Sequence, residues 1–450
     1  MDITVKAFGA YDVRGIYPET INEEIVYRVG RAFPIIFKAK KVAVGHDVRL
    51  SSVSLKEALI KGLTESGCDV VDLAECATEM IYFAAAHLKL DGGIMVTASH
   101  NPKEYNGLKL VKKDAMPISE KSGLTELKNA VAAGDFAVVK EVGKAERYDI
   151  MDEYIAHLLS YINLKELKPY RLVANTGNGA GGPLINAIEK KLPFDIIKVN
   201  NIGDGNFPNG VPNPLLVENR AATAKAVIEN DADLGIAWDG DVDRCFLFDE
   251  NGEFIEGYYL VGLLAESFLK KNPGAKIIGD SRLYWNTKEI CDKYNGKFIL
   301  SRSGHSFIKA KMREEGAVYG GEMSAHNYFA AFSYADSGMI PWLLVLELLS
   351  HSNGKTLSAL VADFKQKFPV SGEINTKVKD AQKVLAAIEK DYADGKIDKL
   401  DGLSVEFDNW RFNLRASNTE PLLRLNVETR GDKDLLDVKT AELLAKIRAN

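Results

Sequence analysis

The chain has 450 residues, of which 46% are hydrophobic and 27% are charged, and its formal net charge at pH 7 is −6. These proportions are typical of globular proteins, and the length predicts three or four domains. The negative charge argues against general nucleic-acid binding, and no apolar run approaches the ~20 residues of a membrane-spanning helix.

The N-terminus and the cysteines are both typical of a cytoplasmic protein. Residues 1–6 lack the charged and apolar regions of a secretory signal peptide. The cysteines are scattered, without CxxC spacing, at Cys68, Cys76, Cys245 and Cys291. We therefore expect a cytoplasmic location and four cysteines that are reduced and mostly buried.

One pattern recurs three times: an apolar strand ends in a polar or glycine-containing loop, and a helical pattern follows. The strands that open the three repeats are 42–44, 171–174 and 276–278. Each is followed downstream by a second strand and loop, with strands at 93–96, 234–238 and 317–319. Strands that alternate with helices predict βαβ units and parallel sheets. Chance similarity of βαβ units is the alternative explanation of the repeat.

The last ~80 residues differ from this pattern. Residues 381–392 and 435–447 predict helices, whereas strands are predicted at 403–407, 411–414 and 422–428. This arrangement indicates an antiparallel sheet. The predicted fold class is therefore α/β: three related domains with mixed, mostly parallel sheets, and a C-terminal α+β domain, around a central cleft. The predicted boundaries are 1–147, 148–250, 251–368 and 369–450.

The first of four informative loops, Thr97 to Pro102, follows the strand 93–96, a favoured place for ligand chemistry in α/β folds. Ser99, His100 and Asn101 present a hydroxyl, an imidazole and an amide, and the proline stops helix formation. A serine held in this way can carry a phosphoryl group. A Ser–His hydrolase pair is disfavoured, because neighbouring side chains of an extended backbone point to opposite sides and no GxSxG surrounds Ser99.

The second loop carries Asp239, Asp241 and Asp243 at alternate positions, followed by Arg244. Three neighbouring carboxylates need a compensating cation, and hard oxygen ligands suit Mg²⁺ or Ca²⁺. The arginine indicates that a phosphate lies nearby. An EF-hand loop is disfavoured, because its sixth position needs glycine and this chain has Arg244 there. A solvated acidic turn remains the alternative.

The third loop runs from Gly320 to His326. Glu322 and Ser324 are two residues apart, so in an extended loop they face the same way, which suits two sugar hydroxyls. A tight turn explains the glycines equally well.

The fourth loop, from Arg415 to Pro421, presents a guanidinium, two hydroxyls and an amide on Arg415, Ser417, Thr419 and Asn418. These groups are typical of a phosphate cradle. A polar hairpin turn before the proline is the alternative.

Together the four loops, in this order, resemble those of the α-D-phosphohexomutase family. The resemblance covers essentially the whole chain and includes the segments 10–15 and 304–306. Within the family the chain is most similar to bacterial phosphomannomutases, because Met323 in the third loop is similar to the mannose/glucose branch. Ala325 departs from the glycine that is common in the family.

The resemblance implies roles for particular residues. Ser99 carries a phosphate in the active enzyme, and Asp239, Asp241 and Asp243 hold one Mg²⁺ together with a phosphoserine oxygen. Acid/base or phosphate-contacting roles fall to His100, Lys109, Arg14 and Arg244. Substrate binding falls to His305, Glu322, Ser324, Arg415, Ser417, Asn418 and Thr419, with Arg282 a further candidate for facing the sugar. An ordinary surface arginine is the alternative for Arg14, and a core histidine for His305.

The resemblance also implies the reaction: mannose 6-phosphate becomes mannose 1-phosphate through a phosphoserine enzyme and a hexose 1,6-bisphosphate, for GDP-mannose synthesis. Glucose or mannose 1,6-bisphosphate would act as the activator. The implied partners are small-molecule sugar phosphates, without nucleic acid or membrane, and the chain is a monomer or homodimer. A phosphoglucomutase or a dual-specificity enzyme is the alternative. A hydrolase is disfavoured by the dedicated fourth loop, and a sensor by the presence of Ser99 and all three aspartates.

Overall fold

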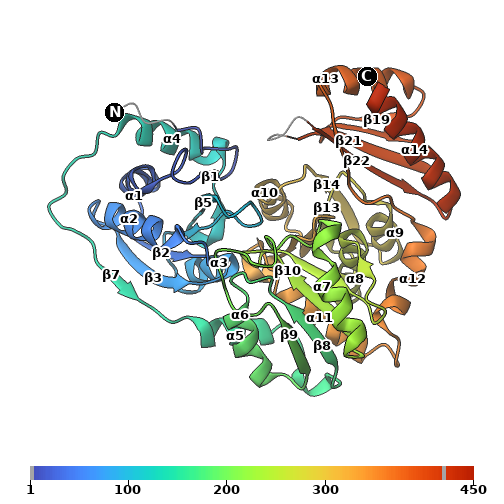
Figure 1. Ribbon diagram of the computed structural model, residues 1–450, viewed down its shortest axis with the longest axis horizontal. Coiled ribbons are helices and arrows are strands. Elements are labelled where there is room, and N and C mark those ends of the chain that lie inside the picture. Colours follow the sequence, from blue (N-terminus) through green and yellow to red (C-terminus); the bar gives the residue numbers. More distant parts are fainter. Residues whose placement is uncertain (1–4, 418–421, 450) are drawn as a thin grey trace. The chain divides into compact units, whose positions relative to one another are not determined.

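The computed structural model describes residues 5–417 and 422–449 of the chain, which form four β-sheets with associated helices (Figure 1). Contacts between Cα atoms divide the chain into two compact units, and each is described by itself. Unit 1 comprises Met1–Phe254 and Tyr328–Gly354, and unit 2 comprises Ile255–Asn327 and Lys355–Asn450. The boundaries of the four domains stay predictions.

The first sheet of unit 1 has the strand order β1-β5-β4-β2-β3-β7, with β6 beside β5. Its strands are β1 (Val13–Ile16), β2 (Lys41–His46), β3 (Asp69–Glu75), β4 (Gly92–Val96), β5 (Tyr105–Lys112), β6 (Met116–Pro117) and β7 (Ala145–Arg147). Its helices are α1 (Glu23–Phe37), α2 (Ser52–Thr64), α3 (Thr78–His87) and α4 (Leu124–Ala133). Strand β2 is parallel to β3 and β4, whereas β5 is antiparallel to β4 and β1, so the sheet is mixed as predicted.

Helix α1 illustrates how local sequence sets an element. The side chain of Asn22 accepts a hydrogen bond from the backbone N–H of Ile25 (3.1 Å), which caps the helix N-terminus. Val26 and Val29, three residues apart, lie on the buried face together with Phe33. The helix ends at Lys38, which adopts the left-handed conformation.

The second sheet of unit 1 has the order β12-β11-β10-β8-β9. Its strands are β8 (Arg171–Asn175), β9 (Asp195–Val199), β10 (Leu234–Trp238), β11 (Cys245–Phe248) and β12 (Phe254–Ile255). Its helices are α5 (Met151–Leu159), α6 (Gly182–Ile188) and α7 (Ala221–Glu229). The returning segment of unit 1 carries β17 (Ala335–Asp336) and α11 (Ile340–Ser350). It packs on this part of the unit, where the rings of Trp342 and Trp238 lie 6.4 Å apart.

Unit 2 contains one parallel and one antiparallel group of strands. In the parallel group β13 (Lys276–Asp280) lies between β14 (Lys297–Ser301) and β15 (Tyr319–Gly321); β16 (Asn327–Phe329) follows in the chain. The antiparallel sheet has the order β18-β22-β21-β20-β19. Its strands are β18 (Ile374–Lys377), β19 (Lys396–Asp398), β20 (Leu403–Glu406), β21 (Trp410–Ala416) and β22 (Leu422–Thr429). The helices of unit 2 are α8 (Gly257–Lys271), α9 (Trp285–Lys293), α10 (His305–Glu315), α12 (Leu357–Lys367), α13 (Ala381–Asp391) and α14 (Lys433–Ala449).

The strand pairs predicted from the repeat are hydrogen-bonded neighbours. Strand β2 pairs with β4, β8 with β10 and β13 with β15, and each pair is parallel. Because parallel neighbours end at the same edge of a sheet, the two loops that follow each pair lie close together. In the three parallel pairs this arrangement brings the first three informative loops close to the loop that follows the partner strand.

Two further expectations concern the cysteines and the membrane. All four cysteines are buried and free, as predicted. Among the described residues, none of the helices combines the length and the apolar character that a membrane crossing demands.

Helix α3 carries a carboxyl group in the core of unit 1. Glu79 is fully buried, and its Oε2 accepts a hydrogen bond from the backbone N–H of Met339 (3.4 Å). Its Oε1 has no hydrogen-bond partner among the described residues. Burial raises the pKa of Glu79 to about 8. The folded protein therefore holds a proton here that the unfolded chain loses above about pH 4.3.

We predict that the contribution of Glu79 to the free energy of unfolding falls as the pH rises from about 4.5 to 8, by roughly 1.4 kcal/mol for each pH unit. The folded state binds one more proton than the unfolded state in this window, so a higher pH favours unfolding. Glu79→Gln keeps the shape and removes the titration. Thermal midpoints from pH 5 to 8 should fall less steeply in E79Q than in wild type. The control is Glu57→Gln at an exposed position of α2; equal slopes in wild type and E79Q would contradict the assignment.

Candidate active site

Two loops of unit 1 meet at the ends of β4 and β10. The serine loop (97–102) follows β4, and the aspartate loop (239–244) follows β10. Their backbones touch at Gly240, where a Cβ atom would lie 2.5 Å from the carbonyl oxygen of Ser99. Only glycine fits at this distance, so the close approach of the two loops depends on it.

Ser99 is buried and adopts the left-handed backbone conformation, with a φ of 50°. Its hydroxyl donates a hydrogen bond to Oδ2 of Asp239 (2.8 Å) and lies 3.0 Å from Nδ1 of His100. The expectation that Ser99 and His100 point to opposite sides is therefore wrong, because it assumed extended backbone. Positive φ is uncommon for residues other than glycine, and such strain is concentrated at functional sites.

A buried arginine holds the serine loop in this conformation. The guanidinium of Arg49, 1% exposed, donates hydrogen bonds to the carbonyl oxygens of Ser99 (2.9 Å), Asn101 (2.7 Å), Pro102 (2.7 Å) and Tyr105 (3.0 Å). Sequence reasoning assigned no role to Arg49. The signal was available, because the residue follows β2, the strand that the repeat paired with β4.

Asp47 links the same two strand ends through hydroxyl groups. Its carboxylate accepts hydrogen bonds from Thr97 (2.7 Å) and Ser52 (2.6 Å) and pairs with Arg49 (3.2 Å). Thr97 Oγ1 in turn accepts the backbone N–H of Ser99 (2.9 Å). Asp47 therefore fixes the backbone of Ser99 indirectly, through the hydroxyl of Thr97.

The three aspartates of the second loop converge. Asp239, Asp241 and Asp243 are each at most 1% exposed, and one ligand oxygen from each lies within 4.8 Å of the others. Burial raises the pKa of Asp239 to about 6, against the opposing charge of Arg244. The Arg244 guanidinium donates from Nε (3.0 Å) and Nη2 (2.9 Å) to Oδ2 of Asp239.

Lys109 supplies the second cation of this cluster. From β5 its ammonium donates a hydrogen bond to Asp241 (2.6 Å) and another to Asp243. Burial acts against the charge, but the aspartates outweigh it and raise the pKa of Lys109, so the group is an ammonium ion at neutral pH. Thr78, which was not predicted, donates to the same oxygen of Asp241 (2.6 Å).

These residues fit a divalent metal ion. The second carboxylate oxygen of Asp241, Oδ1, is buried and has no hydrogen-bond partner among the described residues. An orphaned buried carboxylate oxygen is costly unless a cation binds it. Three hard oxygen donors in one buried cluster could hold Mg²⁺ or a similar ion.

Arg14 and His100 lie at the serine loop. Arg14, from β1, donates hydrogen bonds to Asn101 Oδ1 (2.6 Å) and to Asp12 (2.7 Å). Burial, with the charges of Arg244 and Arg14, lowers the pKa of His100 well below its usual value of 6.5. His100 is therefore a neutral imidazole at pH 7. Of the predicted residues in unit 1, His100 and Asp239 contact Ser99 directly, and Arg14, Lys109 and Arg244 contact the serine loop or the aspartates.

The third loop, in unit 2, places Glu322 and Ser324 on one side of the chain. Nη2 of Arg282 lies 3.3 Å from Oε1 of Glu322 and 3.2 Å from Oγ of Ser324. The same Glu322 oxygen accepts the backbone N–H of Gly304 (2.8 Å), the residue before His305 at the start of α10. The loop therefore brings two of the predicted sugar-binding residues, Glu322 and Ser324, to Arg282.

A tight turn is also present in the third loop. The backbone N–H of Ala325 donates to the carbonyl oxygen of Glu322 (3.0 Å), and Ala325 has a φ of 72°. Glycine adopts this conformation more readily than alanine. The departure of Ala325 from the glycine expected by resemblance therefore falls at a strained position.

The fourth loop is described only in part. Arg415 lies at the end of β21, 3.7 Å from Glu373 and 3.7 Å from Asp401. The backbone N–H of Ser417 donates to the carbonyl oxygen of Leu422 (2.9 Å). Asn418 and Thr419 lie outside the described residues.

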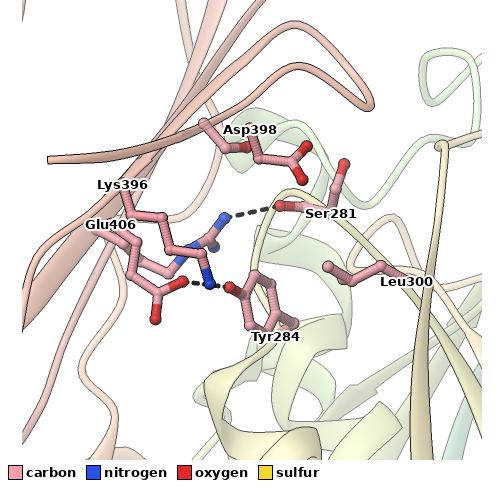
Figure 2. Close-up of a pocket in the computed structure, with 8 residues that line it drawn as sticks. Ser281, Tyr284, Leu300, Lys396, Asp398 and Glu406 are labelled. Atoms are coloured by element: carbon pink, nitrogen blue, oxygen red, sulfur yellow. Dashed lines mark hydrogen bonds between the residues drawn. The ribbon is translucent and has the colours of Figure 1, made fainter. Parts of the chain in front are cut away.

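Unit 2 also contains a small pocket with a volume of about 80 Å³ (Figure 2). Its lining residues are Ser281, Tyr284, Leu300, Lys396, Asp398, Ser404, Glu406 and Arg411. None of these residues was predicted to belong to the site. Arg411 donates to the carbonyl oxygens of Ser281 (2.9 Å) and Arg282 (2.8 Å) and pairs with Glu428 (2.7 Å), so it fixes the backbone that carries Arg282.

Four family models match consecutive parts of the chain. They are described as phosphoglucomutase/phosphomannomutase alpha/beta/alpha domains I, II and III and C-terminal domain, and they match residues 5–138, 152–252, 256–368 and 373–445. The matches follow the order in which the four loops were found.

Similar proteins cover the chain from end to end. A Xanthomonas campestris pv. campestris protein named "Phosphohexose mutases" is 54% identical over 99% of this chain and 100% of its own length. The phosphomannomutase of Escherichia coli K12 is 53% identical over 97% of this chain and 98% of its own. The structure of a phosphoglucomutase/phosphomannomutase family protein from Burkholderia thailandensis superposes with a TM-score of 0.88 at 33% identity, covering 99% of this chain and 98% of the other.

The fold, the order of the loops and the end-to-end similarity agree. The chain is an isomerase that belongs to the phosphoglucomutase/phosphomannomutase family.

Proposed function

We propose that the chain interconverts mannose 6-phosphate and mannose 1-phosphate through a phosphate carried on Ser99. The observation that carries the proposal is the contact of the Ser99 hydroxyl with Asp239 (2.8 Å) in a loop that a buried arginine holds in a strained conformation. The name of the E. coli relative supports mannose as the sugar. The product would supply GDP-mannose synthesis.

We assign the metal site to Asp239, Asp241 and Asp243, with an oxygen of the Ser99 phosphate as a further ligand and Mg²⁺ as the ion. A bound Mg²⁺ withdraws negative charge from a transferring phosphoryl group. Lys109 and Arg244 balance part of the negative charge of the three aspartates and place two further cations beside the serine. Arg14, held by Asn101 of the serine loop, adds a third.

In the first transfer, O1 of the sugar attacks phosphorus while the bond from phosphorus to Ser99 Oγ breaks. The proton of the sugar hydroxyl ends on Ser99 Oγ. His100 is suited to relay it, because its Nδ1 lies 3.0 Å from Oγ and its lowered pKa leaves the imidazole neutral. In the second transfer the 6-phosphate passes to Ser99 Oγ, and the serine proton returns to O6.

The second half of the cycle needs a site for the phosphate that is not reacting. We assign this role to Arg415, Ser417, Asn418 and Thr419, and sugar contacts to Glu322, Ser324 and His305. Between the two transfers the 1,6-bisphosphate reverses its orientation, so the same residues must accept either end of the sugar. Glucose phosphates differ from mannose phosphates only at C2, so phosphoglucomutase activity is the alternative. Parallel kinetics on mannose 1-phosphate and glucose 1-phosphate distinguish the two.

Ser99→Ala should abolish nearly all mutase turnover without unfolding the protein, because the phosphate acceptor is lost. Intact-mass measurement should find a phosphorylated fraction in wild type and none in the variant. Ser160→Ala, at an exposed position, is the matched control and should keep both phosphate and activity. Turnover at the wild-type rate in S99A would exclude the phosphoserine mechanism.

Removal of divalent metal should stop the reaction, and added Mg²⁺ should restore it. Mg²⁺ should also raise the thermal midpoint of wild type, because it neutralises buried carboxylates. In Asp241→Asn, Mg²⁺ should restore little activity and raise the thermal midpoint little. Asp195→Asn at an exposed site should respond to Mg²⁺ as wild type does. An unchanged rate after thorough chelation would show that the metal assignment is wrong.

Trace glucose or mannose 1,6-bisphosphate should activate the dephosphorylated enzyme. Escape of the intermediate leaves Ser99 without phosphate, and the bisphosphate can return a phosphoryl group to it. The measurement is a mutase assay with and without bisphosphate, on protein shown by mass to lack phosphate. Absence of activation would count against the reorienting cycle.

A further inference from the structure

Three arginines of unit 2 converge on a single carboxylate, that of Glu373. Nη1 of Arg282 lies 3.5 Å from Oε2, and Nη2 of Arg415 lies 3.7 Å from the same oxygen. Nη1 of Arg424 lies 3.4 Å from Oε1. The glutamate precedes β18, whose residue Asn375 pairs with Arg424 on β22, so the sheet itself brings these groups together.

The hydrogen-bonding capacity of this cluster is not exhausted. The distances from Arg282 and Arg415 exceed the 2.7–3.2 Å of ordinary N–H···O bonds. The Nε–H groups of Arg415 and Arg424 and the Oε2 atom of Glu373 are buried and have no hydrogen-bond partner among the described residues. Guanidinium donors left in this way are suited to a multidentate anion such as a phosphate.

The charges explain why a carboxylate lies here. Burial, together with the charges of Arg282 and Arg424, lowers the pKa of Arg415, whereas Glu373 and Asp401 act in the opposite direction. Without a counter-ion the three guanidinium groups repel one another. Asp280 already pairs with Arg282 (2.8 Å), and Asp401 lies 3.7 Å from Arg415, but Glu373 is the carboxylate that all three arginines share. A phosphate that binds to Arg415 therefore gains the attraction of the arginines and meets the repulsion of Glu373.

We propose that Glu373 limits the strength with which the arginine cluster holds the non-reacting phosphate. The inference rests on the proposed function, in which the bisphosphate must leave the cradle and return with its other end. Binding energy that is equal before and after a reaction step does not accelerate it, and excess affinity would trap the intermediate. Glu373 acts through the arginines that it positions, and it weakens phosphate binding enough for release.

The test is Glu373→Gln, which keeps the shape of the side chain and removes its charge. Competitive inhibition by inorganic phosphate should become about three- to tenfold tighter, and KM for both sugar monophosphates should fall by a similar factor. At the same time kcat should fall, because release of the intermediate slows. Asp394→Asn removes one negative charge at an exposed position of the same unit and should leave these constants unchanged.

If Glu373 only holds the arginines in place, E373Q should raise KM and weaken inhibition by phosphate; this result, or unchanged constants at a wild-type thermal midpoint, would overturn the proposal. Phosphate binding by calorimetry does not depend on turnover. It therefore tests the role of Glu373 even if wild type shows no mutase activity, which would refute the proposed function separately.

Discussion

The concentration of negative charge behind Ser99 is the constraint on which unit 1 depends. Three aspartates within one buried cluster would each cost several kcal/mol without compensation. Lys109 and Arg244 provide part of that compensation from a neighbouring strand and from the aspartate loop itself. The orphaned oxygen of Asp241 shows that this compensation is incomplete, and a divalent cation bound to the three aspartates would complete it. The charges that stabilise the buried aspartates are therefore the same ones that lie beside the Ser99 hydroxyl.

The serine loop holds its central residue in a strained backbone conformation. Ser99 has a positive φ, and Val242 in the opposing loop has a φ of 65°, which is unusual for a β-branched residue. Four hydrogen bonds from Arg49 and the close approach at Gly240 hold the serine in this conformation. The result is a hydroxyl directed at Asp239 and within reach of a neutral imidazole.

Unit 2 has the opposite electrostatic character at its candidate site. There the arginines gather, and single carboxylates such as Glu373 and Asp280 balance them. In the proposed cycle the intermediate carries two phosphate groups, so the site would have to attract phosphate strongly enough for binding and weakly enough for release. Carboxylates among the arginines fit both requirements of this proposal, because they reduce the net positive charge without removing the hydrogen-bond donors.

The sequence by itself determined much of this protein. Apolar runs that end in polar loops predicted the strand pairs β2–β4, β8–β10 and β13–β15, because a period of βαβ units is a local property of the chain. Asp239, Asp241 and Asp243 predicted a cation site, because three aspartates in one short loop lie close together whatever the rest of the fold. Buried, unpaired cysteines and an antiparallel C-terminal sheet were also predicted correctly.

Only the tertiary structure decided which distant residues join the site. Arg49, Thr78 and Glu373 lie in loops or at helix starts without a motif of their own, and their roles arise from strand order and register. The turn of Ser99 toward His100 could not be predicted either, because a positive φ is imposed by Arg49 and Gly240 from outside the loop. The local sequence pattern determines which functional groups each loop carries, whereas the packing of the strand ends determines which of these groups come into contact.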